Sequence, residues 1–352
     1  MLAVVIPKPG EFELREVPLP EPFSGEVLLA VKATTMCGTD QKILAGQFAG
    51  VAYPHIPGHE FAGEVVATGA DVDELAPGDR VGVEVHVGCG RCSRCLEGLY
   101  QLCLNYGRRD RGHAHIGFTV PGGLAEYVAV PAKALHRLPL QVSWDEGAFT
   151  DNIGIAMYAV ERGELRAGEN VVVIGPGAFG ALAVQVARAM GASRIVLLGT
   201  RSERLARLHG FGADELVAAR GDEAVERVRQ IFGGDGADLV IEFAGTAEAA
   251  RQAVLLVRRG GRVVLAGSTG AGQELTGVDL SCIVRGHLDI RGSLANPRGI
   301  SARGLELIAR GAVDVKPLIT HSFELGQFMD AWRTFTQREG GAIRVMLHPT
   351  GQ

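Results

Sequence analysis

The chain has 352 residues, of which 47% are hydrophobic and 21% charged, and its formal net charge is −5. This length exceeds what a single hydrophobic core usually serves, so two domains are expected. The acidic balance, without any block of Lys and Arg, argues against nucleic acid or a membrane surface as a partner. Because the N-terminus lacks a basic segment and no stretch approaches the ~20 apolar residues of a membrane span, we expect a cytoplasmic protein.

The first part of the chain, to about residue 150, predicts an antiparallel β domain. Short β-rich runs alternate there with Pro and Gly turns such as Ala76–Asp79. The expected strands lie at 27–33, 61–67, 80–85 and 125–130.

A different pattern begins near residue 155, where apolar runs alternate with helical stretches, as is typical of a parallel, doubly wound sheet. We expect an α/β domain over 155–291 and a β-rich domain over 1–154, to which the tail 292–352 returns. The expected strands of the α/β domain are 171–174, 194–198, 238–242 and 262–266, and its expected helices are 180–190, 202–209 and 246–259. The tail is expected to contain helices at 302–310 and 325–337 and a strand at 342–347.

The stretch from Gly175 to Gly180 follows an apolar run and opens a helical pattern, so a strand, a glycine turn and a helix are expected in succession. Gly175 permits the tight turn, Gly177 lets the main chain approach a pyrophosphate, and Gly180 lets the helix pack on the strand. The free N–H groups at the helix start, near Ala178 and Phe179, then face the anion. Glycine-rich turns are common, but this position between a strand and a helix predicts a dinucleotide site.

Four of the six cysteines share one short segment, in which two residues separate Cys89 from Cys92 and Cys92 from Cys95, and Cys103 follows. Thiolates at such spacings can converge on one tetrahedral zinc ion, and a shell of four sulfurs is structural because it leaves no open position. A redox Cys-x-x-Cys pair and an iron–sulfur site are the alternatives. We expect structural zinc, since a reducing compartment favours metal ligands over disulfides and no Cys-Pro follows the last cysteine.

Cys37 and His59 form a sparser pair. Each residue alone is more often a buried thiol or a hydrogen-bonded core histidine than a metal ligand. Both follow apolar β-type segments and both have a glycine neighbour, so a thiolate and an imidazole at strand ends can bind one metal with an open position. Zinc with an open position can polarise a carbonyl or stabilise an alkoxide.

In their order along the chain, Cys37-Gly-Thr-Asp40, Gly58-His-Glu60, the four-cysteine segment and the glycine turn resemble the zinc-dependent medium-chain dehydrogenase/reductase superfamily, which includes alcohol, polyol and threonine dehydrogenases. The resemblance extends over essentially the whole chain. It implies a GroES-like catalytic domain for the β-rich part and a Rossmann dinucleotide-binding domain for the α/β part. It also implies two zinc ions per chain and a nicotinamide cofactor.

The resemblance further implies roles for single residues. Cys37 and His59 match the catalytic zinc ligands, and Glu60 matches an acidic neighbour that can approach the metal. Asp151 matches the remaining ligand position, with capping of the following helix as the alternative. Thr39 matches the hydroxyl that passes the substrate proton onward, with a local backbone cap as the alternative. The implied reaction moves a hydride from the carbinol carbon to nicotinamide.

Lys42 stands where many members of this family have a histidine that relays the proton. A lysine is charged at neutral pH, so the exit route of the proton is left open. Arg344 resembles a family arginine near the pyrophosphate, with a solvated surface arginine as the alternative. Nicotinamide-side contacts are expected from Gly267, Ser268, Ser293 and Leu294.

The end of the second α/β strand bears on the choice of cofactor, because a carboxylate is expected there in an NAD-binding fold of this kind. Gly199 takes the place of the acid, and Thr200, Arg201 and then Arg204 follow. A small residue makes room for a 2′-phosphate and an arginine pairs with it, as in NADP-dependent bacterial secondary-alcohol dehydrogenases. We therefore expect NADP(H) to be favoured over NAD(H). The alternative is that Arg201 begins a solvated helix and Glu203 binds the ribose.

The resemblance implies a secondary alcohol or polyol, and its ketone, as the substrate pair. An L-threonine or amino-alcohol dehydrogenase is one alternative, which His86 favours unless it is an exposed loop histidine. A non-catalytic cofactor-binding protein is the other, and the intact Cys37 and His59 oppose it. A homo-oligomer, preferably a tetramer, is implied, with the strand at 287–293 at an interface. The candidate pocket residues by family position are Gln47, Phe48, Val85, His86 and Phe118.

Overall fold

The computed structural model describes residues 1–270 and 272–351, which form two compact units. Unit 1 contains Met1–Gly154, Asn296–Ala309 and the segment from Val315 onward, and unit 2 contains Ile155–Ala295 and Arg310–Asp314. The chain thus returns to unit 1 at Asn296 rather than at residue 292. Within the described residues, no helix has the length and apolar character needed to cross a bilayer.

Unit 1 is built on a seven-stranded sheet in the order β16-β17-β3-β4-β5-β9, with β8 also paired to β3. Its central strand, β3 (Glu26–Thr35), is buried along most of its length. Apolar side chains from β3 and its neighbours form the main core of the unit. They include Val27, Leu29, Val31, Phe61, Val81 and Val128.

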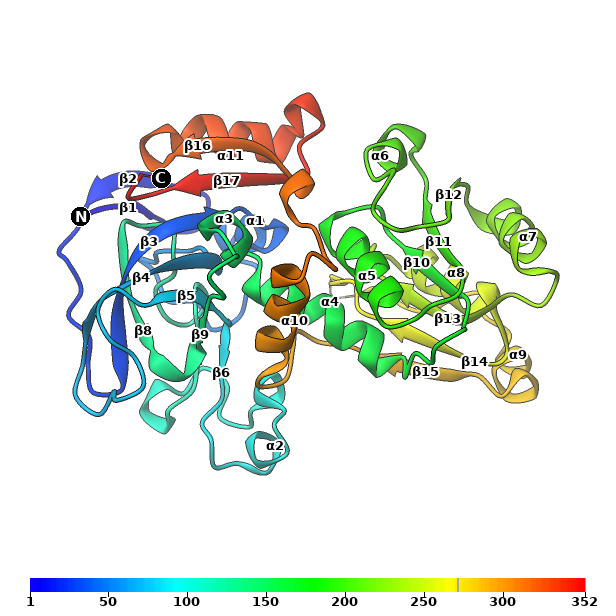
Figure 1. The fold of residues 1–352 in the computed structure, drawn as a ribbon, viewed down its shortest axis with the longest axis horizontal. Helices are drawn as coiled ribbons and strands as arrows, with labels where there is room; N and C mark the ends of the chain where they lie inside the picture. The colour runs from blue at the N-terminus through cyan, green and yellow to red at the C-terminus, as the bar shows by residue number, and fades with distance from the viewer. Residues whose placement is uncertain (271, 352) are drawn as a thin grey trace. The chain divides into compact units, whose positions relative to one another are not determined.

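One strand pair of this sheet is parallel, and it lies in the tail, outside the residues for which an antiparallel pattern was predicted. β16 (Ile319–Glu324) lies parallel to β17 (Arg344–His348), because α11 (Phe328–Gln337) lies between them in the chain and forms a crossover. Figure 1 shows α11 running alongside these two strands, on which its apolar residues Phe328 and Ala331 pack.

Unit 1 contains further strands and helices, of which α4 continues into unit 2. The strands are β1 (Leu2–Val5), β2 (Glu13–Glu16), β4 (Glu60–Thr68), β5 (Arg80–Val83), β6 (His86–Val87), β7 (Ala114–His115), β8 (Tyr127–Pro131) and β9 (Leu135–Arg137). The helices are α1 (Gly38–Leu44), α2 (Ser93–Leu96), α3 (Trp144–Gly147), α4 (Thr150–Arg162) and α10 (Ile300–Ala309).

Unit 2 is a parallel six-stranded sheet in the order β12-β11-β10-β13-β14-β15. β10 (Val171–Ile174) is wholly apolar and buried, as is typical of a central parallel strand. β10 pairs with β11 on one side and β13 on the other, so a topological switch point lies at the carboxyl ends of these strands. The other elements are β11 (Ile195–Gly199), β12 (Glu215–Ala218), β13 (Ala237–Glu242), β14 (Val257–Leu265), β15 (Asp289–Gly292), α5 (Ala178–Ala189), α6 (Ser202–Ala206), α7 (Gly221–Phe232), α8 (Ala247–Leu256) and α9 (Leu280–Gly286).

Several boundaries differ from the sequence-based expectation. The predicted helix 246–259 ends at Leu256, and the chain continues directly into β14, where Gly260 and Gly261 do not favour a helix. The predicted helix 202–209 ends at Ala206, and the predicted strand 80–85 ends at Val83. β12 (Glu215–Ala218) was not predicted, because the pattern of so short an apolar run does not distinguish a strand from a segment of helix.

Candidate active site and metal centres

Two strand ends that are neighbours in the sheet bring Cys37 and His59 together. Thr35, the last residue of β3, pairs in register with Glu60, the first of β4, so the residues just beyond these ends are adjacent. The donor atoms of Cys37, His59 and Glu60 lie within 4.8 Å of one another. A thiol, an imidazole and a carboxyl in this arrangement fit a single zinc ion that keeps room for another ligand.

Asp40, in the first turn of α1, orients this group. Its Oδ1 lies 3.3 Å from His59 Nδ1, and its Oδ2 accepts the Cys37 main-chain N–H at 2.8 Å. A carboxylate at Nδ1 leaves His59 Nε2 for a metal. Burial by itself lowers the pKa of His59, but the charges of Asp40 and Cys37 raise this pKa well above its usual value. Sequence reasoning gave Asp40 no role, although its spacing from Cys37 is that of a capping box.

Both carboxyl oxygens of Glu60 are hydrogen-bonded. Thr35 Oγ1 makes a short hydrogen bond to Oε2, Asn152 Nδ2 donates to Oε1 at 2.7 Å, and Arg344 Nη1 donates to Oε2 at 2.6 Å. Sequence reasoning missed Thr35 and Asn152, since neither stands in a motif that signals metal chemistry. These donors make Glu60 a fixed negative charge beside the Cys37–His59 pair.

The burial of Arg344 excludes one of its two predicted positions. A solvated surface arginine was the alternative to a position near the pyrophosphate, but the side chain is 4% exposed, and Nη1 also donates to the Met36 carbonyl oxygen at 3.2 Å. The pairing of β17 with β3 places it there, with Met346 opposite Thr35. The surface alternative is therefore wrong. Within unit 1, the guanidinium donates a hydrogen bond to the Glu60 carboxyl.

Asp151 lies in the first turn of α4. It is inside α4 rather than before it, so the capping alternative is wrong, and its Oδ1 accepts the Val85 N–H at 3.2 Å. Among the described residues, it is outside the donor group of Cys37, His59 and Glu60. Burial raises the pKa of Asp151 to about 7, against the opposing effect of the Val85 N–H. Glu60 rather than Asp151 supplies the carboxyl that forms one donor group with Cys37 and His59.

Thr39 lies beside the possible metal ligands. Its Oγ1 is 3.7 Å from Cys37 Sγ, and the side chain is half-buried. Lys42 follows one turn later in the same helix, α1. The Thr39 hydroxyl is thus placed to exchange a proton with a molecule bound near Cys37.

A column of rings stands next to His59. Ring centroids are 4.8 Å apart for His59 and Phe118, 3.7 Å for Phe118 and His115, and 4.0 Å for His115 and His86. Phe48 packs on Phe118 at 4.7 Å. His86 is buried, so the exposed-loop alternative is wrong. Of the other candidate pocket residues, Val85 is buried and Gln47 is exposed.

The segment that contains Cys89, Cys92, Cys95 and Cys103 is called the four-cysteine lobe, and its thiols also converge. The Sγ atoms of Cys89 and Cys95 are 3.9 Å apart, and those of Cys92 and Cys103 are 4.0 Å apart. Four sulfurs at ~2.3 Å from one zinc ion would be separated by about 3.8 Å, so these free thiols fit a closed tetrahedral site. Burial by itself raises the pKa of Cys89, but hydrogen bonds from the N–H groups of Arg91 and Asn105 lower this pKa to about 6.

Lys133 joins the two ends of this four-cysteine lobe. It comes from a turn between β8 and β9, and its Nζ donates to the carbonyl oxygens of Gly88 at 3.0 Å and Gly112 at 3.4 Å. Burial lowers the pKa of Lys133, and the charges of Cys89 and Cys95 oppose that shift. A cation so placed offsets the net negative charge of a zinc ion with four thiolates.

In unit 2, the predicted glycine turn connects β10 to α5. Gly175 has φ +111°, and a side chain on Gly180 would collide with the Gly175 carbonyl, so both positions require glycine. Gly177 precedes the first residue of α5, and apart from its own neighbours in the chain no described residue comes within 4 Å of where its Cβ would be. An open main chain at the start of a twelve-residue helix fits the pyrophosphate of a dinucleotide. Ala178 and Phe179 form its first turn.

Gly199 ends β11, and its small size has a second cause besides the cofactor. A Cβ atom there would lie 2.5 Å from Pro176 Cγ and 2.7 Å from its Cδ. An acidic side chain therefore does not fit this position without movement of the glycine turn. Thr200 and Arg201 follow as exposed residues, and α6, which contains Arg204, starts immediately after them.

The expected nicotinamide contacts follow β14 and β15 at the same carboxyl edge of the sheet. The N–H of Ser293 donates to the Leu265 carbonyl at 2.9 Å, whereas its Oγ is buried without a partner among the described residues. Such a hydroxyl is the kind of group that a ligand satisfies. Leu294 is 58% exposed, and Gly267 and Ser268 follow β14.

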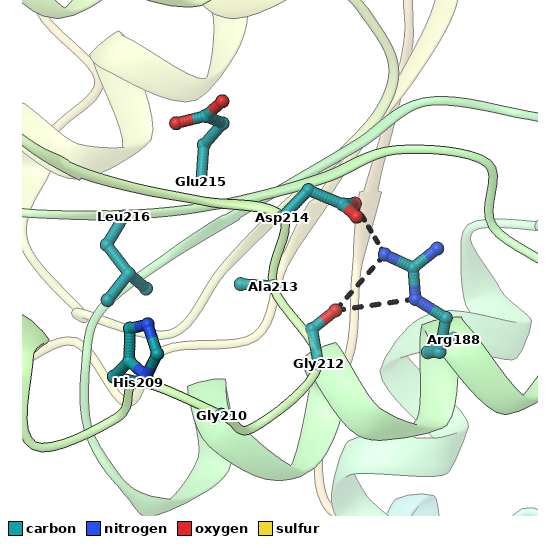
Figure 2. Close-up of a pocket in the computed structure, with 8 residues that line it drawn as sticks. All are labelled: Arg188, His209, Gly210, Gly212, Ala213, Asp214, Glu215 and Leu216. Atoms are coloured by element: carbon teal, nitrogen blue, oxygen red, sulfur yellow. Dashed lines mark hydrogen bonds and ion pairs between the residues drawn. The ribbon is translucent and has the colours of Figure 1, made fainter.

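A hollow of about 590 Å³ lies at the opposite, amino edge of the sheet (Figure 2). Arg188 lines this hollow, where it forms an ion pair with Asp214 and donates to the Gly212 carbonyl at 3.2 Å. The Asp214 N–H in turn donates to Ile195 at the start of β11. Because these polar groups already pair with one another, we assign no part of the reaction to this hollow.

Comparisons with known proteins agree with this arrangement. The family described as "alcohol dehydrogenase GroES-like domain" matches residues 24–140, and that described as "zinc-binding dehydrogenase" matches residues 178–310. The chain is 31% identical to a sorbitol dehydrogenase of Bacillus subtilis, over 99% of the chain and 97% of that protein. It is 32% identical to an L-threonine 3-dehydrogenase of Bacillus licheniformis, over 99% of each.

A similar solved structure, with a TM-score of 0.89, 32% identity and 99% coverage of both chains, is described as a zinc-binding dehydrogenase from Sinorhizobium meliloti bound to NADP. The matches confirm the predicted combination of a GroES-like domain with a Rossmann domain. The chain therefore belongs to the zinc-dependent medium-chain dehydrogenase/reductase superfamily and is an NAD(P)-dependent oxidoreductase.

Proposed function

We propose that the protein interconverts a secondary alcohol or polyol and its ketone, and that it prefers NADP to NAD. The observation that carries the proposal is the group of donor atoms from Cys37, His59 and Glu60, within 4.8 Å of one another. We also propose two zinc ions per chain, a catalytic one at this group and a structural one in the four-cysteine lobe.

Each residue around the first group has a distinct part in the proposed reaction. Cys37 and His59 hold the catalytic zinc, with His59 oriented by Asp40 at 3.3 Å. When bound, zinc polarises the substrate oxygen, and the nicotinamide cofactor accepts the hydride from the carbinol carbon. Thr39 accepts the hydroxyl proton of the alcohol and passes its own proton onward. Glu60 contributes a fixed negative charge, and the aromatic column beside His59 excludes water.

The proposed preference for NADP depends on the end of β11. Gly199 leaves no acid to bind a ribose 2′-hydroxyl or to repel a phosphate, and Arg201 is exposed two residues later. A guanidinium there pairs with a 2′-phosphate through charge-assisted hydrogen bonds.

Steady-state kinetics with both cofactors over polyols, secondary alcohols and L-threonine tests the proposal. We expect the highest kcat/KM with a polyol or secondary alcohol and NADP. Turnover of L-threonine alone would favour the second candidate, an amino-alcohol dehydrogenase, which the buried His86 and the L-threonine dehydrogenase relative support. Efficient use of NAD with weak use of NADP would contradict the cofactor preference.

We also propose a homo-oligomer, preferably a tetramer, that uses the β15 edge of unit 2. Leu280 and Val284 of the neighbouring helix α9 are each 72% exposed, which is costly for a free surface. Light scattering after size exclusion tests the assembly, and a monomer would contradict it.

We propose a cytoplasmic location as well. All six cysteines are free thiols, which supports this location.

A further inference from the structure

Glu242 is the last residue of β13 and is buried at the carboxyl edge of the sheet in unit 2, with 1% exposure. A buried carboxyl is costly unless hydrogen bonds replace the lost water. Its donors are main-chain groups, and the N–H of Gly245 donates to Oε1 at 2.6 Å. The N–H groups of Ala244 and Gly267 also face the carboxyl.

These donors come from two separate loops. Ala244 and Gly245 follow β13, whereas Gly267 follows β14. The main-chain carbonyl of Glu242 adds to the connection, because it accepts the N–H groups of Ala266 at 2.9 Å and Gly267 at 2.8 Å. A single residue therefore ties the loop after β13 to the loop after β14.

The two loops pack against each other and against the glycine turn with no space for side chains. A Cβ atom on Gly245 would lie 2.8 Å from the Ser268 carbonyl oxygen, and one on Gly267 would lie 2.8 Å from Glu242 Oε2. A Cβ atom on Gly175 would lie 2.9 Å from the Ala244 nitrogen. A small shift of one loop therefore moves the others.

We propose that Glu242 is a positioning residue for the nicotinamide half of the cofactor. Its carboxyl fixes the loop that carries Gly267 and Ser268, which are the expected nicotinamide contacts. The adenosine half is expected at Gly199 and Arg201, on the loop after β11. None of the hydrogen bonds of the Glu242 carboxyl described above reaches that loop. This inference depends on the proposed cofactor site, and nothing in it requires a particular alcohol.

The test compares Glu242→Gln with Glu215→Gln, a matched change in β12, where the half-exposed Glu215 pairs with Arg194 at 3.2 Å. Calorimetry measures Kd for NADPH and NADH, and for their adenine halves, adenosine 2′,5′-bisphosphate and AMP. In Glu242→Gln, the side-chain NH2 group faces main-chain N–H groups that previously donated to the carboxyl. We therefore expect the Kd of this variant for the whole dinucleotide to rise about tenfold. Its Kd for the adenine half should not change, and Glu215→Gln should change neither.

A purely structural role would weaken whole and half cofactor equally in Glu242→Gln, and this result, or no change in either, would overturn the positioning role alone. Wild-type protein that binds neither dinucleotide would overturn the cofactor site itself and the positioning role with it. Should Glu242→Gln not fold, Glu242→Asp serves in its place, because it keeps the charge but withdraws the carboxyl by one methylene. The same selective loss is then expected.

Discussion

Arg344 and Glu60 form a buried ion pair in unit 1, with Nη1 2.6 Å from Oε2. Arg344 begins β17 and Glu60 begins β4, and both strands pair with β3. The tail of the chain thereby fixes the carboxyl that forms one donor group with Cys37 and His59. Burial by itself lowers the pKa of Arg344, but the charges of Glu60 and Cys37 outweigh burial and raise it.

Arg344→Met should destabilise unit 1 by about 3 kcal/mol, because it leaves the Glu60 charge buried without its cation. Urea unfolding followed by circular dichroism measures this loss. The double variant Arg344→Met/Glu60→Gln should recover most of it, since a neutral amide needs no cation. A double variant as unstable as the single one would show that packing of Arg344, and not its charge, matters.

Lys133→Met should release zinc from the four-cysteine lobe roughly tenfold faster, because the cation that closes the lobe and offsets its charge is lost. A coloured chelator in excess reports the release rate. Lys8→Met is the control, since Lys8 is exposed and pairs with Glu11 in a surface contact. Equal release rates in the two variants would contradict the role of Lys133.

Gly199→Asp, the change that would introduce an NAD-type acid, should lower stability by about 1–3 kcal/mol and weaken binding of both cofactors. The cause is the 2.5 Å approach of any Cβ atom to Pro176 Cγ. Pro176→Ala in the same chain removes the obstructing ring and should restore stability. Thermal melting and cofactor titration measure both effects. A stable Gly199→Asp single variant would refute the steric argument.

Several buried histidines, His86, His113 and His115 among them, should make unit 1 sensitive to acid. Burial lowers the pKa of His86 to about 3 and that of His113 to about 4, and it lowers that of His115 well below its usual value. Unfolded histidine titrates near pH ~6.5, so below that pH the unfolded chain binds protons that the folded chain does not. The contribution of these histidines to stability should therefore be full above pH ~6.5 and fall toward pH ~4, by up to about 1.4 kcal/mol per pH unit for each histidine, whereas the raised pKa of Asp151 acts in the opposite direction.

His115→Phe keeps a ring in the aromatic column and removes one titrating group, so its stability should fall less steeply with acid than that of the wild type. Urea midpoints between about pH 7.5 and pH 5 measure the slope, which follows from proton linkage. His209→Asn is the control because His209 is exposed. A slope in His115→Phe equal to that of the control would mean that His115 does not drive the acid effect.

The sequence predicted what depends on local pattern. β10 was predicted with its observed limits, because four consecutive buried apolar residues precede a glycine turn. The cysteine spacing likewise predicted convergence of the lobe thiols, which lie close in the chain and need few long-range contacts to meet.

What the sequence did not reveal depends on strand order. Thr35 and Asn152 reach Glu60 only because β3, β4 and α4 meet, and Arg344 is 284 positions away from Glu60 along the chain. The start of α4 likewise directs the Asp151 carboxyl to the Val85 N–H, a contact that no local pattern indicated. A single sequence contains no signal for such contacts between distant elements.

The most direct test of the proposed catalytic centre is zinc content and turnover in Cys37→Ser beside the wild type. Cys37 belongs to the open donor group with His59 and Glu60, and the lobe thiols form a separate group. Elemental analysis should find two zinc ions per wild-type chain and one per Cys37→Ser chain, with NADP-dependent alcohol oxidation abolished and stability nearly unchanged. A Cys37→Ser protein that keeps the wild-type zinc content and wild-type turnover would contradict the catalytic zinc at Cys37 and His59.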